Sequence, residues 1–197
     1  MDKKDVIKIT LELIKEKKLE KTSIGEIVKK LDSSPGNLYY HFKSKNAIYK
    51  ETADYSAEEI IRNLDKVKLN RNKEENLFRL TKALIKFFEE RDEILFFLIG
   101  MKGSCYFDTD IEPKNFLINF KKVLLNSEHS IEYEKSIILK LRMFLGSLYE
   151  VLYVNKLVNS RNLSEEEIKK IHVSFWGNKA EENHRKYKYE NLKFGLS

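Results

Sequence analysis

Hydrophobic and polar positions repeat at helical spacing from the N-terminus of the chain. Val6, Ile9 and Leu13 fall on one face of a first predicted helix, which ends at a pair of lysines a few residues later. A second apolar stripe begins after Ser23. Ser23 and Glu26 have the spacing of a capping box, in which the two side chains satisfy free amides at a helix start. The pattern therefore predicts two consecutive helices.

A short third helix is predicted after a polar turn. Asp32-Ser33-Ser34 interrupts the apolar pattern, and its last serine is a good N-cap. Pro35 suits the first helical position because proline has no amide to leave unpaired. The helix covers residues 35–42, with Leu38 and Phe42 facing inward. Two helices joined by a three-residue polar turn are typical of a helix-turn-helix, whose second helix enters the major groove of DNA.

Apolar stripes at helical spacing continue through the rest of the chain. A fourth helix is expected over about residues 47–64, and residues 94–101 are apolar all round, which indicates a buried helix. Ser164 and Glu167 repeat the capping-box spacing at the start of a last helix, which ends near Trp176. Other helical stripes cover residues 77–88, 116–124 and 137–154, with a loop over 106–112 and a helix start at Pro113.

Composition favours an all-α fold. The 197 residues include only 7 glycines and 2 prolines, too few turn formers for a sandwich or barrel of many strands. Hydrophobic residues make up 42% of the chain and charged residues 35%, which excludes a disordered chain and allows an ordinary core.

Several classes of protein are excluded by what the chain lacks. The longest uncharged apolar run, residues 94–101, is far shorter than the roughly 20 residues of a membrane span. The first five residues have no apolar stretch of a signal peptide. The single cysteine, Cys105, excludes an intrachain disulfide framework and a multi-thiolate metal site. We expect a cytoplasmic protein.

The basic charge is concentrated in the first quarter of the chain. The net charge is +6, and residues 1–50 hold 12 lysines against 7 acidic residues. Such asymmetry indicates a basic module that binds nucleic acid, joined to a nearly neutral one. A lysine-rich solvated helix face gives the same asymmetry, so charge alone leaves both interpretations open.

Three N-terminal segments resemble the DNA-binding domain of the tetracycline-repressor (TetR) family of transcriptional regulators. The resemblance covers about residues 5–51. It is carried by Val6-Ile7-x-Ile9-Thr10-Leu11-x-Leu13-Ile14, by Thr22-Ser23-Ile24-x-Glu26-Ile27, and by Ser34-x-Gly36-x-Leu38-Tyr39-Tyr40-His41-Phe42-Lys43-Ser44-Lys45.

The resemblance implies a helix-turn-helix domain over residues 1–47 and a helical effector-binding and dimerisation domain over 48–197, in which 177–197 form a polar tail. It implies a homodimer that binds double-stranded DNA with one recognition helix, residues 35–42, from each subunit. The family positions that commonly touch the DNA backbone are matched here by Ser23, Tyr39, His41 and Lys45. Positions at or near base edges are Ser34, Pro35, Gly36, Asn37 and Tyr40.

The chemistry of these residues agrees with that implication. Lys43 and Lys45 offer phosphate contacts, which position a protein without reading sequence. Asn37 is suited to pair with N6 and N7 of adenine.

The sequence departs from the family pattern at four positions. Gly25 stands where many members have a basic residue near the groove. Asp32-Ser33 replaces a Gly-Val pair in the turn, which brings a negative charge close to DNA and removes an apolar plug. Lys18 replaces a glycine at the end of the first helix, where a positive φ costs a non-glycine residue about 1 kcal/mol.

The resemblance further implies a cavity for a small-molecule effector in the larger domain. Aromatic residues are dense there, and polar ones among them can orient a ligand, although aromatic stripes at helical spacing more often form core. The candidate ligand-binding residues are Phe87, Phe97, Tyr106, Phe116, Asn119, Arg142, Phe144 and Tyr149.

The last two helices are the implied dimer interface, although their apolar stripes can equally pack within one subunit. The candidate interface residues are Leu145, Leu148, Leu152, Ile168, Ile171, Phe175 and Trp176.

The sequence gives little support for catalysis. None of the four histidines has a partner at metal-ligand spacing, and there is no glycine-rich phosphate loop. We therefore expect no metal, no cofactor and no enzyme. The function predicted is a repressor released from a palindromic operator by its ligand. Two alternatives remain open: a ligand-dependent activator or corepressor-type regulator, and a helical ligand-binding dimer that has lost operator recognition.

Overall fold

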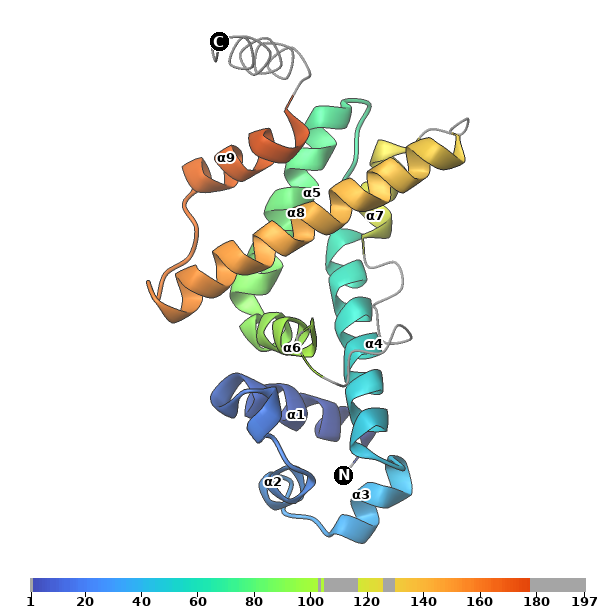
Figure 1. Ribbon diagram of the computed structural model, residues 1–197, viewed down its shortest axis with the longest axis vertical. Helices are drawn as coiled ribbons and strands as arrows, with labels where there is room; N and C mark the ends of the chain where they lie inside the picture. The colour runs from blue at the N-terminus through green and yellow to red at the C-terminus, as the bar shows by residue number, and fades with distance from the viewer. Residues whose placement is uncertain (1, 103, 105–116, 126–129, 178–197) are drawn as a thin grey trace, which may run out of the picture.

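The computed structural model describes residues 2–102, 104, 117–125 and 130–177, and every regular element in these ranges is a helix (Figure 1). The predicted all-α fold is confirmed. The helices are α1 (Lys3–Lys17), a 3₁₀ turn (Leu19–Lys21), α2 (Ile24–Lys30), α3 (Pro35–His41), α4 (Lys45–Leu64), α5 (Lys73–Glu90), α6 (Asp92–Lys102), α7 (Ile118–Leu124), α8 (Ile131–Leu157) and α9 (Glu165–Trp176). The loop and helix start expected between residues 106 and 113 lie outside the described residues.

The helix ends form where the capping signals lie. Both predicted capping boxes are present, at Ser23 with Glu26 and at Ser164 with Glu167. Ser44 caps α4, so that this helix begins two residues earlier than its apolar stripe indicates. Lys18 follows α1 with a φ of 70°, the strained conformation that the missing glycine predicted.

Two hydrophobic clusters divide the molecule, and α1 contributes to both. Val6 and Leu13 of α1 join a small cluster with buried residues of α2, α3 and the start of α4. Ile7, Leu11 and Ile14 face the other way, into a large cluster that extends through α9. Figure 1 shows α1, α2 and α3 at one end of the molecule, with α4 running away from them. The small cluster is therefore joined to the large one through a shared helix.

The joint between the domains is closely packed around α6. The Tyr49 ring of α4 lies edge-on to Phe97 of α6 at 6.2 Å, and its hydroxyl donates to the Leu19 carbonyl at 3.3 Å. A Cβ at Gly100 would lie 3.2 Å from the Leu19 side chain, so glycine permits this close approach. Lys15 adds an ion pair to Asp92 at 2.7 Å across the same joint.

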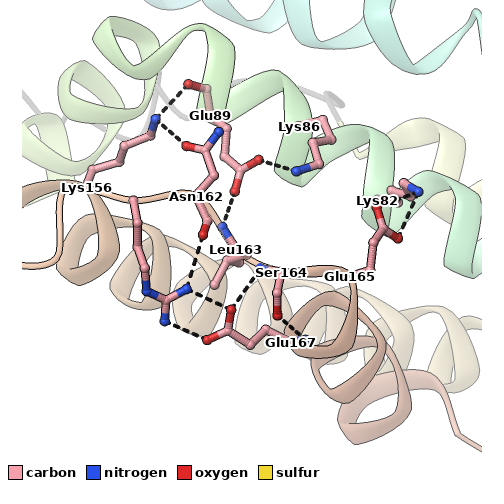
Figure 2. A network of polar contacts seen from close by, with 10 residues as sticks. Lys82, Lys86, Glu89, Lys156, Asn162, Leu163, Ser164, Glu165 and Glu167 are labelled. Carbon is pink, nitrogen blue, oxygen red and sulfur yellow. Dashed lines mark hydrogen bonds and ion pairs between the residues drawn. The ribbon is translucent and has the colours of Figure 1, made fainter.

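A network of hydrogen bonds and ion pairs holds the α8–α9 connection against the end of α5 (Figure 2). The buried Glu89 carboxylate accepts hydrogen bonds from the Leu163 amide at 2.6 Å and from Lys86 Nζ at 2.8 Å. Lys156 of α8 donates to the Glu89 carbonyl oxygen at 2.9 Å and to the Asn162 side chain at 2.8 Å. These contacts fix where the chain turns from α8 into α9.

None of the helices in the described ranges is both long enough and apolar enough to cross a lipid bilayer.

Candidate DNA-binding surface

The turn between α2 and α3 is held by a Schellman motif. The Ser33 amide donates to the Val28 carbonyl, and the Asp32 amide donates to the Lys29 carbonyl, each at 3.2 Å. Asp32 takes the left-handed conformation that the motif requires, with a φ of 48°. Aspartate tolerates this region better than most residues. The Asp-Ser pair thus replaces Gly-Val without loss of the turn.

Helix α3 is anchored on one side and open on the other. Leu38 and Phe42 are buried in the small cluster, as predicted. The Ser34 hydroxyl accepts the Asn37 amide at 3.2 Å and caps the helix ahead of Pro35. On the outer side Tyr39 is 51% exposed and Tyr40 85% exposed. Side chains this exposed are not covered by the rest of the described subunit, so the outer face of α3 is available to a partner.

The other predicted DNA-contacting residues surround this open face. Pro35, Gly36, Asn37 and Lys43 are exposed, and His41 is half-buried with its ring 5.1 Å from that of Tyr40. The half-buried Lys45 has its Nζ 5.3 Å from the centroid of the Tyr49 ring. These residues belong to α3, the segment after it and the first turn of α4, so the fold brings them to one end of the molecule.

Ser23 stands at the exposed start of α2. Its hydroxyl accepts the Glu26 amide at 3.2 Å. Lys17 contacts the Glu26 carboxylate at 2.5 Å and, with the Ser23 amide, lowers the pKa of Glu26. Gly25 is exposed beside it, and a Cβ there would meet only the Ser23 hydroxyl, at 3.9 Å. The neutralised start of α2 leaves the lysines after α3 as the basic part of this surface.

One contact in this surface was not predicted. The Asn37 side chain donates from Nδ2 to the Ser33 hydroxyl at 3.1 Å. Ser33 lies in the turn just before the N-cap of α3, outside the helix, so helical spacing gave no reason to pair it with Asn37.

The candidate ligand-binding residues are dispersed through the large core. Phe97 lies at the joint with Tyr49, while Phe87 and Tyr149 both contact the buried ring of Phe88, at 5.6 and 5.7 Å. Burial raises the pKa of Tyr149. Phe144 packs between Phe120 and Trp176. Tyr106 and Phe116 lie outside the described residues.

The two polar candidates are placed differently. Asn119 is buried and donates to Asp65 at 2.8 Å, while its Oδ1 has no hydrogen-bond partner among the described residues. Arg142 lies on the exposed face of α8, away from the aromatic core. The Trp176 Nε1 atom, which was not among the ligand candidates, is also buried without a partner in the described ranges.

The candidate dimer residues face the interior of the subunit. Leu145, Leu148, Leu152, Ile168 and Trp176 are buried in the large cluster, and Ile171 and Phe175 are half-buried against it. A different set of apolar side chains on the same helices is exposed. On α8 these are Ile131, Tyr133, Leu139, Met143, Val154 and Leu157, and on α9 the exposed one is Val173.

Comparison with known proteins agrees with this geometry. Residues 6–52 match the model of the family described as "Bacterial regulatory proteins, tetR family". An 80-residue segment is 32% identical to an uncharacterized HTH-type transcriptional regulator, YvdT, of Bacillus subtilis (strain 168). That segment spans 41% of this chain and only 40% of the length of the curated relative.

The whole fold is similar to solved TetR-family structures. A regulator from Marinobacter aquaeolei VT8 superposes with a TM-score of 0.69 at 19% identity, covering 88% of this chain and 93% of that one. A putative family member from Shewanella sp. PV-4 gives a TM-score of 0.72 at 15% identity, covering 88% and 95%. Residues 6–52 therefore match the tetR family of bacterial regulatory proteins, and the chain as a whole has the fold of the solved TetR-family structures.

Proposed function

We propose that this protein is a transcriptional regulator that binds DNA as a homodimer, with α3 of each subunit in the major groove. The observation that carries this proposal is the two-sided character of α3. Leu38 fixes its inner side, while Asn37, Tyr39 and Tyr40 are exposed beside Lys43. A short helix held rigidly with its polar end outward is what direct readout requires. Such a regulator acts in the cytoplasm and needs no catalytic group.

The proposed dimer interface is the exposed apolar stripe of α8. Leu139, Met143, Val154 and Leu157 follow one line along this helix, on which the exposed Glu150 also lies. Gly146 lies on the same line, and a Cβ there would meet nothing within 4 Å, which leaves room for a second helix to approach. An exposed apolar stripe on a long helix is typical of an interface. Leu145 and Leu148 support this stripe from within.

The proposed regulation is release from DNA by a small molecule. A ligand that binds one arrangement of the dimer more tightly shifts the population towards it. The packed joint supports this mechanism, because Phe97 and Gly100 of α6 press on Tyr49 and Leu19. A change in α6 therefore reaches α1 and α4. The Oδ1 atom of Asn119, which has no partner in the described part of the chain, is a buried group that a ligand can satisfy.

The test is selection of duplex DNA by the purified full-length chain from a randomised library, followed by binding at several salt concentrations. We expect a palindromic site, with half-sites one DNA turn or a multiple apart and affinity that falls steeply with salt. Failure to select any site, with weak binding that ignores sequence, would contradict the proposal and favour a dimer that has lost operator recognition. Screening of small molecules against the selected complex then separates a repressor from a corepressor-dependent member.

A further inference from the structure

Asn37 is the side chain on α3 best suited to read a base, and the structure holds it in place. Its Nδ2 donates to the Ser33 hydroxyl at 3.1 Å, although Asn37 itself is exposed. An exposed asparagine without such a contact samples several rotamers, and ordering it on binding costs free energy.

Ser33 is a rigid support for this contact. Its backbone is the last member of the Schellman motif, bonded to Val28 of α2. Its side chain is half-buried between α2 and α3. The backbone of Ser33 is therefore fixed relative to α2, and its hydroxyl accepts the Asn37 side-chain amide from that position.

The contact leaves the reading edge of Asn37 available. Nδ2 carries two hydrogens, and only one is used by Ser33. The other hydrogen and Oδ1 can pair with N7 and N6 of adenine, the bidentate contact that distinguishes adenine from other bases in the major groove.

We propose that Ser33 is a positioning residue for base recognition, which holds Asn37 ready for an adenine and so sets a preference for one A·T pair in each half-site. This inference rests on the proposed function, because it assumes that α3 enters the groove. It assigns a role to a position in the turn before α3.

The experiment uses the DNA site selected by the full-length chain and a set of its single base-pair variants. Four proteins are compared with the wild type: Ser33→Ala, Asn37→Ala, the double variant, and Ser33→Thr, which keeps a hydroxyl. Ser174→Ala is the matched control, since its hydroxyl bonds the Lys170 carbonyl on α9 at 2.8 Å, far along the chain from α3. Thermal unfolding of each variant checks that it is folded.

We expect Ser33→Ala to lower discrimination at one A·T pair by roughly three- to tenfold, the range of a single hydrogen bond. Affinity for random DNA and the salt dependence should stay unchanged, because no phosphate contact is lost. In the Asn37→Ala background the Ser33 substitution should have no further effect on discrimination. Ser33→Thr and Ser174→Ala should retain the discrimination of the wild type.

Two results would overturn the inference while leaving the proposed function standing. In one, wild type selects a site and Ser33→Ala discriminates as well as wild type. In the other, Ser33→Ala loses affinity equally for all DNA, which would mean that the serine only stabilises the turn. Selection of no site by the wild type would overturn both the inference and the function on which it rests.

Discussion

Gly36 occupies the first turn of α3, where a side chain would point outward. A Cβ at this position would meet only the Ser34 hydroxyl, at 3.9 Å, which is ordinary van der Waals contact. Nothing within the subunit therefore requires glycine here. Close approach of the backbone to a ligand is the remaining physical reason for a residue without a side chain.

Replacing Gly36 with alanine should therefore separate folding from binding. We expect Gly36→Ala to leave the free energy of unfolding unchanged or raise it by up to about 1 kcal/mol, because alanine favours a helix. Affinity for the selected DNA should fall, since the methyl group keeps the helix start away from the duplex. Thermal unfolding and DNA titration measure the two effects. An affinity equal to that of the wild type would show that the DNA lies farther from Gly36.

His172 of α9 is buried against α5, and this predicts a pH-dependent stability. Its Nδ1 has no hydrogen-bond partner among the described residues, and its ring lies edge-on to Phe78 at 5.2 Å. Burial lowers the pKa of His172, and the charge of Glu74 opposes this shift only in part. Glu75 and Lys169 line the same shallow groove.

The direction of the pH dependence follows from the linkage between proton binding and folding. Because the pKa is lower in the folded state, the unfolded chain binds more protons as pH falls through about 6.5, and stability is lost from there downward. We expect the temperature of the thermal unfolding midpoint to decrease as the pH is lowered from 7.5 to 5.5. The decrease should be smaller in His172→Gln than in the wild type. Equal slopes in the two proteins would assign the pH dependence to other groups.

At the scale of elements, the α8–α9 connection depends on one carboxylate. Glu89→Ala leaves the buried Leu163 amide without its acceptor, which we expect to lower the free energy of unfolding by about 2 kcal/mol. Glu89→Gln keeps an acceptor oxygen for the Leu163 amide and loses the charge that pairs with Lys86, so we expect it to lower the free energy of unfolding less than alanine does. Urea unfolding at a fixed protein concentration compares the two variants. Lys86→Ala is the control for the ion pair alone, because it keeps the acceptor for Leu163 and leaves the buried carboxylate without its cation. If glutamine proved as damaging as alanine, the hydrogen bond to Leu163 would not be what secures the loop.

The elements themselves were predictable because their signals are local. Ser164 and Glu167 cap α9 through bonds between residues three apart, and the spacing alone reveals them. The face that α8 buries was not predictable in the same way. Its leucines occupy both sides, with Leu148 inside and Leu139 outside, so periodicity indicates a helix without showing what covers each side.

In the candidate DNA-binding surface, too, some features were predictable from the sequence and others were not. The residues of α3 were identified from the family resemblance, and Leu38 and Phe42 lie buried as their spacing predicts. The contact between Ser33 and Asn37 depends on the backbone conformation of the turn before α3, which the residue spacing does not give. Long-range contacts such as Glu89 with Leu163 escaped prediction for the same reason, since 74 positions separate the two residues.

At the scale of the whole molecule, the two clusters make the recognition helix depend on distant parts. Helix α1 is buried from both sides, so the N-terminal domain cannot tilt without disturbing the large core. Lys15 and Asp92 add an ionic contact at the same joint. In a dimer built on α8, the spacing between two α3 helices is therefore set by the packing of both subunits.

The stripe on α8 gives this dimer its test. Met143 is 60% exposed near the middle of α8, and Met143→Asp would place a carboxylate inside the proposed interface. Burying an unpaired charge is expensive, so we expect the dimer to dissociate at least about 100-fold more readily, while the subunit remains folded. Ile131→Asp is the matched control, since Ile131 is 75% exposed at the start of α8 and lies off the stripe.

Sedimentation over a range of concentrations measures the association, and binding to the selected palindrome measures its consequence. Monomeric Met143→Asp should lose most of its affinity for the full site and keep its weaker binding to a half-site, because each recognition helix is intact. If Met143→Asp stayed dimeric at low concentration, the dimer interface would have to lie elsewhere than on this face of α8. A monomer with undiminished affinity for the palindrome would instead show that DNA brings the subunits together without this stripe.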